Sequence, residues 1–126
     1  MEQTHLFQGV EHIGIKTVSI EEGIQFYTKV LGFEFLYRVK PGLVELAFLR
    51  LDGTVIELVE MKEGDQYEDG VVNHIALTVS DIEKAVEWLK ENKVTLMQDK
   101  PASLGEGRYN FFFRGPSGEK LELYQG

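Results

Sequence analysis

The chain has 126 residues, of which 43% are hydrophobic and 27% are charged, a balance typical of a folded globular protein. Its net charge of −8 argues against nucleic acid as a partner, because phosphate binding relies on clusters of Lys and Arg. No apolar run approaches the ~20 residues that a membrane span needs, and the N-terminus lacks the basic and apolar regions of a secretory signal. The chain has no cysteine, which excludes disulfides and Cys nucleophiles, so we expect a cytoplasmic protein without a membrane partner.

Two stretches of the chain repeat one another. Residues 10–27 resemble residues 73–89, with His12 matching His74, and residues 52–58 resemble residues 117–123, with Glu57 matching Glu122. A copy of about 60 residues buries only a marginal fraction of its surface by itself. We therefore expect a single domain over 1–126, built from an N-terminal module at 9–61 and a C-terminal module at 72–125.

The first module predicts the element order βαβββ. Residues 9–17 alternate as a strand that carries His12, and a helix follows from the N-cap Ser19 until Gly32 ends its apolar pattern. Three more strands are expected, and the Asp52-Gly53 pair suits a tight turn between the last two. These strands span about 33–39, 43–50 and 54–61.

The second module repeats this order. A strand at 72–79 precedes a helix at about 81–92, capped by Ser80 or Asp81, and strands follow near 94–98, 108–114 and 119–125. The fold class predicted is α+β, with two βαβββ modules forming curved mixed sheets. We expect the aromatic side chains of both modules to lie in the core. They are Phe26, Tyr27, Trp88 and the run Phe111-Phe112-Phe113.

Two glutamates occupy unusual strand positions. Period-2 alternation places Glu57 on one face with Val55 and Val59, and a carboxylate among valines needs a compensating partner because burying an unpaired charge costs several kcal/mol. Glu122 stands between two leucines in the same way. A single strand Glu or a single His is more often a solvated residue than a ligand.

A His and a Glu recur at matching places in both copies, which favours a metal site over solvated residues that occur there by chance. His12 and His74 open equivalent strands, so a pseudo-twofold axis would gather two imidazoles and two carboxylates into an N2O2 site for a divalent ion. The third histidine, His5, has no counterpart in the second copy. We expect it to be exposed to solvent.

The paired modules and their motifs resemble the vicinal oxygen chelate superfamily, and within it glyoxalase I, over residues 9–125. The motifs are Phe26-Tyr27-Thr28-Lys29-Val30-Leu31-Gly32-Phe33, Val55-Ile56-Glu57-Leu58, Asn73-His74-Ile75-Ala76-Leu77 and Leu121-Glu122-Leu123. In this superfamily, extradiol dioxygenases and fosfomycin-modifying transferases use two His and one Glu, without a ligand at the position of Glu57. Epimerase relatives carry a catalytic Glu where this chain has Leu46. Glu57 therefore favours the glyoxalase I type.

The resemblance implies a metal-dependent lyase or isomerase. Its substrate is the hemithioacetal of methylglyoxal and a thiol, and its product is an S-2-hydroxyacylthiol formed through an enediolate. The metal ligands implied are His12, Glu57, His74 and Glu122, with Glu122 as general base and Glu57 assisting proton transfer on the other stereoisomer. One divalent ion per site is implied, with Ni²⁺ or Co²⁺ favoured and Zn²⁺ possible. A homodimer with two such sites is also implied.

Two positions depart from glyoxalase I. The family usually has Arg and Asn as glutathione contacts where this chain has Lys16 and Met61. Lys16 can pair with a carboxylate as a point charge but lacks the bidentate fork of Arg, and Met61 cannot replace an amide. Another thiol, another chelate enzyme (epimerase, dioxygenase or thiol transferase) and a non-catalytic protein that binds a small molecule or drug therefore remain alternatives.

Overall fold

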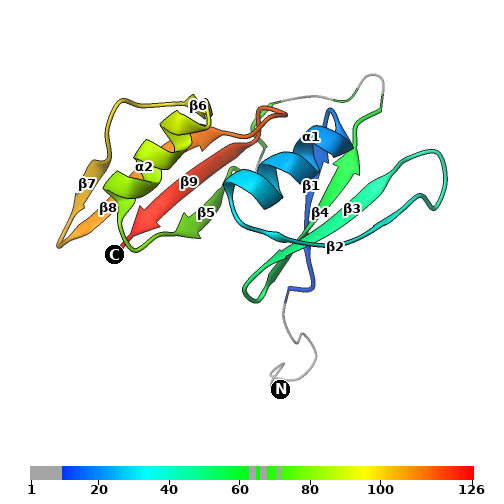
Figure 1. Ribbon diagram of the computed structural model, residues 1–126, viewed down its shortest axis with the longest axis horizontal. Coiled ribbons are helices and arrows are strands. Elements are labelled where there is room, and N and C mark those ends of the chain that lie inside the picture. The colour runs from blue at the N-terminus through cyan, green and yellow to red at the C-terminus, as the bar shows by residue number, and fades with distance from the viewer. Residues whose placement is uncertain (1–9, 63–64, 66–67, 71) are drawn as a thin grey trace, which may run out of the picture. The chain divides into compact units, whose positions relative to one another are not determined.

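The computed structural model describes residues 10–62, 65, 68–70 and 72–126, and the chain divides into two compact units, Met1–Met61 and Lys62–Gly126. Each unit is a mixed sheet with a helix packed across one face (Figure 1). The fold class is α+β with two βαβββ-like sheets, as the sequence predicted. None of the helices in the described ranges is long and apolar enough to cross a membrane.

In the first unit the sheet order is β1-β4-β3-β2, with β1 parallel to β4 and the other neighbours antiparallel. The strands alternate between a face covered by the helix and an open face. Ala47, Leu49, Ile56 and Leu58 are at most 1% exposed and form the core under the helix. The elements are β1 (Ile13–Thr17), α1 (Ile20–Gln25), η1 (Phe26–Val30), β2 (Glu34–Val39), β3 (Leu46–Leu51) and β4 (Thr54–Glu60).

The first helix is not the uniform α-helix that the periodicity predicted. It begins as expected, since the side chain of Ser19 accepts a hydrogen bond from the Glu22 N–H. From Phe26 to Val30 it widens into a π-helical turn, in which the Leu31 N–H donates to the Phe26 carbonyl. Gly32 then ends the helix with a φ of 81°, a left-handed conformation that favours glycine.

In the second unit the sheet order is β5-β9-β8-β6, and β7 also pairs with β8. The short strands β6 and β7 both pair with β8, at different places along it, where a single strand, β2, pairs with β3 in the first unit. The elements are β5 (Ile75–Thr78), α2 (Ile82–Glu91), β6 (Thr95–Leu96), β7 (Ala102–Gly105), β8 (Arg108–Arg114) and β9 (Lys120–Gln125). Of the two predicted caps, Asp81 accepts the Lys84 N–H.

The sequence did not predict β7. All four of its residues are exposed, so the segment has no alternation of buried and exposed positions to reveal a strand.

The predicted aromatic core is right for some residues and wrong for others. Tyr27, Phe111 and Phe113 are buried, at 1%, 0% and 0% exposure. Trp88 is 47% exposed, because helix α2 turns Ile82, Val86 and Leu89 toward the sheet and Trp88 lies beside that stripe. Phe112 alternates with its buried neighbours and therefore lies on the open face of the sheet.

Candidate metal centre

The two predicted glutamates lie at equivalent places in the two sheets. Glu57 is in the middle of β4, opposite Phe48, and Glu122 is in the middle of β9, opposite Phe112. Their neighbours along the strand are buried against the helix, so both carboxylates belong to the open face of their sheet. Glu122 is only 8% exposed. A carboxylate so deeply buried requires a compensating partner.

Each carboxylate faces the histidine of its own unit. Nε2 of His12 lies 3.4 Å from Oε1 of Glu57, and Nε2 of His74 lies 3.0 Å from Oε1 of Glu122. Both histidines immediately precede the first strand of their unit, which is parallel to the strand that carries the glutamate. The structure therefore brings the four predicted ligands together as two pairs, one in each unit.

The second ring nitrogen of each histidine is held by the preceding residue. Nδ1 of His12 lies 2.6 Å from a carboxylate oxygen of Glu11, and Nδ1 of His74 lies 3.0 Å from the side-chain carbonyl oxygen of Asn73. When Nδ1 of a neutral ring donates to these oxygens, Nε2 presents its lone pair. Such a hydrogen bond is the usual partner of a metal-binding imidazole.

These pairs suit a cation. A neutral imidazole nitrogen and a carboxylate oxygen are both acceptors, so their approach is unfavourable unless a proton or a metal ion lies between them. For His12, the hydrogen bond to Glu11 is the largest cause that raises its pKa above 6.5, and Glu57 raises this pKa further. Nitrogen and oxygen ligands about 2.1 Å from one ion are about 3.0–3.4 Å apart, the range of both pairs. The donor set therefore fits a divalent metal.

One pair alone does not complete a metal site. Among the described residues, no group of three or more His, Cys, Asp and Glu side chains is placed to hold an ion.

An aromatic ring supports each histidine. His12 meets the ring of Phe48 edge to face at 5.7 Å, and His74 meets Phe112 in the same way at 5.3 Å. The surroundings then diverge, because Tyr37 stacks on Phe48 while the ammonium group of Lys120 lies over the ring of Phe112. Beside the histidine, the first unit therefore presents stacked aromatic rings, whereas the second unit presents the positive charge of Lys120.

Sequence reasoning missed the residues that orient the ligands. Phe48 and Phe112 occupy matching positions of the repeat, which was a usable signal, but Phe112 was assigned to the core. Asn110 donates its side-chain N–H to Oε2 of Glu122 at 2.9 Å. No pattern in the sequence identified Asn110, because its role depends on the register between β8 and β9.

The two predicted substrate residues lie in the first unit. Lys16 is exposed on β1, paired with Val59, and its position alternates with the buried Ile15 and Thr17, so it shares the open face with Glu57. Met61 follows β4, and its backbone N–H donates to the carbonyl of Thr17. His5 lies outside the described residues.

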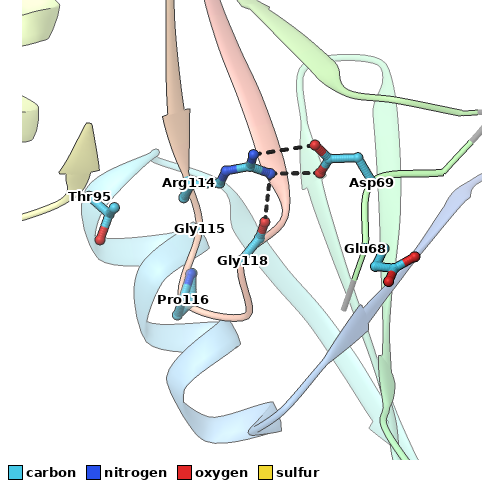
Figure 2. Close-up of a pocket in the computed structure, with 7 residues that line it drawn as sticks. All are labelled: Glu68, Asp69, Thr95, Arg114, Gly115, Pro116 and Gly118. Atoms are coloured by element: carbon cyan, nitrogen blue, oxygen red, sulfur yellow. Dashed lines mark hydrogen bonds and ion pairs between the residues drawn. The ribbon is translucent and has the colours of Figure 1, made fainter. Parts of the chain in front are cut away.

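A separate, open pocket of about 600 Å³ lies near the turn between β8 and β9 (Figure 2). None of the four predicted metal ligands lines it. Its centre is the ion pair between Arg114 and Asp69, with N–O distances of 2.6 and 3.2 Å, and Arg114 also donates to the Gly118 carbonyl. The guanidinium group is therefore already engaged, and it joins the segment that precedes β5 to the turn between β8 and β9.

This ion pair predicts an acid-sensitive contribution to stability. The hydrogen bond from Arg114 lowers the pKa of Asp69 below 3.8, so the stabilisation is present above the unfolded-state pKa and is lost as the pH falls through the lowered value. We expect Asp69→Asn to lower the urea midpoint of unfolding at pH 7, and the difference from wild type to shrink below about pH 4. Asp99→Asn, the same change at an exposed carboxylate, should have little effect. A difference independent of pH would contradict the ion-pair explanation.

Comparison with known proteins identifies a family and several relatives of the chain. Residues 9–123 match the model of the Glyoxalase/Bleomycin resistance protein/Dioxygenase superfamily. The chain is 36% identical to protein YwbC of Bacillus subtilis (92% of this chain, 96% of the relative). It is 30% identical to the metallothiol transferase FosB of Staphylococcus haemolyticus (96% and 86%) and 30% identical to the lactoylglutathione lyase of Escherichia coli O157:H7 (90% and 90%). The crystal structure of the fosfomycin resistance protein FosX from Listeria monocytogenes shares the fold, with a TM-score of 0.77 at 23% identity over 95% of this chain and 94% of that one.

Proposed function

The chain belongs to the Glyoxalase/Bleomycin resistance protein/Dioxygenase superfamily, and from this premise we propose that it is a metal-dependent lyase of the glyoxalase I type. The substrate proposed is the hemithioacetal of methylglyoxal and a cellular thiol, and the product is an S-2-hydroxyacylthiol. The observation that carries the proposal is the matched pair of ligands, since Glu57 faces His12 as Glu122 faces His74. Two carboxylates, rather than one, distinguish this arrangement from a two-His, one-Glu centre.

We propose that His12, Glu57, His74 and Glu122 hold one divalent ion, with Ni²⁺ or Co²⁺ favoured over Zn²⁺. When bound, the ion supplies a Lewis acid that stabilises negative charge on the substrate oxygens, an effect worth several kcal/mol. The two imidazoles act as neutral ligands, each oriented through its Nδ1 hydrogen. Because each unit supplies one pair, the centre is completed either within one chain or, as we propose, between two chains of a homodimer.

The isomerisation needs a proton to move between adjacent carbons. We assign this transfer to Glu122, whose carboxylate is the more buried of the two and is held by Asn110. A carboxylate removes the proton from one carbon and returns it to the next, so atoms and charge balance without a further reactant. We propose that Glu57 assists proton transfer on the opposite stereoisomer. Lys16, exposed on the open face of the first unit, is proposed to contact a carboxylate of the thiol.

Thiol transfer to an epoxide is the second candidate. It is favoured by the 30% identity to the metallothiol transferase FosB over 96% of this chain. Glu57 argues against it, because those transferases lack a ligand at that position. A protein of the same family that binds its ligand without turnover would also use the same open faces.

Metal loading followed by parallel assays separates these functions. We expect the protein reconstituted with nickel, cobalt or zinc to bind about one ion per chain and to isomerise methylglyoxal adducts of at least one cellular thiol. Each loaded form should also be assayed for thiol transfer to fosfomycin, and sedimentation at the assay concentration should show a dimer. Transfer without isomerisation would establish the second candidate. Metal binding without either reaction would leave a binding protein.

A further inference from the structure

The carboxylate of Glu122 is held at both of its oxygens. Oε1 lies 3.0 Å from Nε2 of His74, and Oε2 accepts a hydrogen bond from the side-chain amide of Asn110 at 2.9 Å. The carboxylate itself is largely removed from solvent, since Glu122 is 8% exposed. A hydrogen bond to a charged group in such surroundings is stronger than one between neutral groups.

The other copy of the repeat lacks this amide. Phe112 pairs with Glu122, and two residues earlier on the same strand stands Asn110. In the first unit Phe48 pairs with Glu57, and two residues earlier stands Leu46, which has no side-chain donor. The two carboxylates are therefore equivalent in backbone position and in their histidine, yet they differ in the residue beside them.

We propose that Asn110 is a positioning residue that selects Glu122, rather than Glu57, as the carboxylate that moves the proton. This inference rests on the isomerisation proposed above. The amide fixes Oε2 and so orients the carboxylate, which leaves Oε1, the oxygen 3.0 Å from Nε2 of His74, to face the metal ion and the substrate at a defined place. Proton transfer depends on such placement, because a base must lie within hydrogen-bond reach of the proton it removes. Glu57, with Leu46 beside it, has no equivalent anchor from that position.

The first test needs no turnover. Asn110→Leu introduces the residue of the other copy, and Asn110→Ala removes the donor without adding a charge. We expect each change to weaken Ni²⁺ affinity by ~10–100-fold, the usual effect of losing a group that orients a metal ligand. Leu46→Met, at the matching position of the first unit, neither adds nor removes a donor and should leave the affinity unchanged. Wild-type affinity in both Asn110 variants would overturn the proposal.

The second test moves the amide from one copy to the other. In the wild-type background, Glu122→Gln should lower kcat more than Glu57→Gln does, with a smaller change in KM. In the double variant Asn110→Leu/Leu46→Asn this order should reverse, because the donor then lies beside Glu57. Circular dichroism and thermal unfolding verify that each variant is folded. If the double variant misfolds, Asn110→Leu alone replaces it. In that background the kcat losses caused by Glu122→Gln and Glu57→Gln should become more similar.

The possible outcomes distinguish failure of base selection by Asn110 from failure of the proposed lyase activity. An unchanged order in the folded double variant would show that Asn110 does not select the base. If the loaded wild-type protein catalyses no isomerisation while both Asn110 variants lose Ni²⁺ affinity, the proposed lyase activity fails and base selection fails with it. The anchoring of Glu122 by Asn110 would then be established as a feature of the metal centre alone.

Discussion

Glu122→Gln is expected to lower turnover by about 10²–10⁴-fold while keeping the fold and most of the metal binding. The amide has nearly the same shape as the carboxylate. Its oxygen can still face His74, where Oε1 now lies 3.0 Å from Nε2, once the side-chain amide of Asn110 turns so that its oxygen accepts from the new N–H. What the variant loses is the ability to take up a proton. The loss should therefore fall on kcat, with KM little changed.

Steady-state kinetics of the metal-reconstituted variant provide the measurement, with metal content determined on the same samples. Glu57→Gln is the matched control, because Glu57 occupies the same place in the other copy and faces His12 at 3.4 Å. Its effect should be smaller for the preferred stereoisomer of the substrate. Equal losses in the two variants would indicate that the carboxylates share the transfer. A Glu122→Gln variant with full metal content and wild-type kcat would remove Glu122 from the reaction.

The repeat explains why so much of the fold was predictable. Each module carries its own local signals, such as the cap at Ser19 and the two-residue turn at Asp52-Gly53 that joins Leu51 to Thr54. Because the chain contains two copies, an element predicted in one module supports the matching element in the other. Strands with one face buried against a helix, such as β4 and β8, alternate strongly because only one of their faces meets the core.

The parts that the sequence did not reveal lack this local signature. The exposed strand β7 has no buried face, and the π-helical turn at Phe26–Val30 alters the spacing of a helix whose apolar pattern reads as a regular α-helix. Trp88 was assigned to the core by its chemical character, although its position on α2 lies outside the buried stripe.

The candidate metal centre likewise contains residues that the sequence predicted and one that it did not. The histidines and glutamates were identified because the repeat supplied two independent instances of each. Asn110 was not, because its counterpart is Leu46 and the contact with Glu122 depends on how two strands pair. Repetition therefore reveals what the two copies share, and register reveals where they differ. The proposed difference in function between Glu122 and Glu57 depends on strand register, so the repeat alone does not reveal it.

His74→Ala is expected to weaken binding of Ni²⁺ or Zn²⁺ by more than about 10²-fold. Replacing a group that only orients a ligand already costs about 10–100-fold, and this change removes a proposed ligand itself. It also leaves Glu122 without the imidazole that lies 3.0 Å from its Oε1, in a site where the carboxylate is 8% exposed. A water molecule can take the vacant position, but it contributes less than a ligand fixed by the fold.

Calorimetric titration of the metal-free protein provides the measurement. His12→Ala should produce a loss of similar size if one ion uses both pairs, whereas a loss confined to one variant would show that a single His–Glu pair dominates binding. His5→Ala is the control, since the repeat gives that histidine no counterpart and no role in the centre. Unchanged affinity in both His12→Ala and His74→Ala would contradict the proposed site. Comparable losses in the two variants, together with binding of about one ion per chain, would support the proposal that both His–Glu pairs hold the same ion.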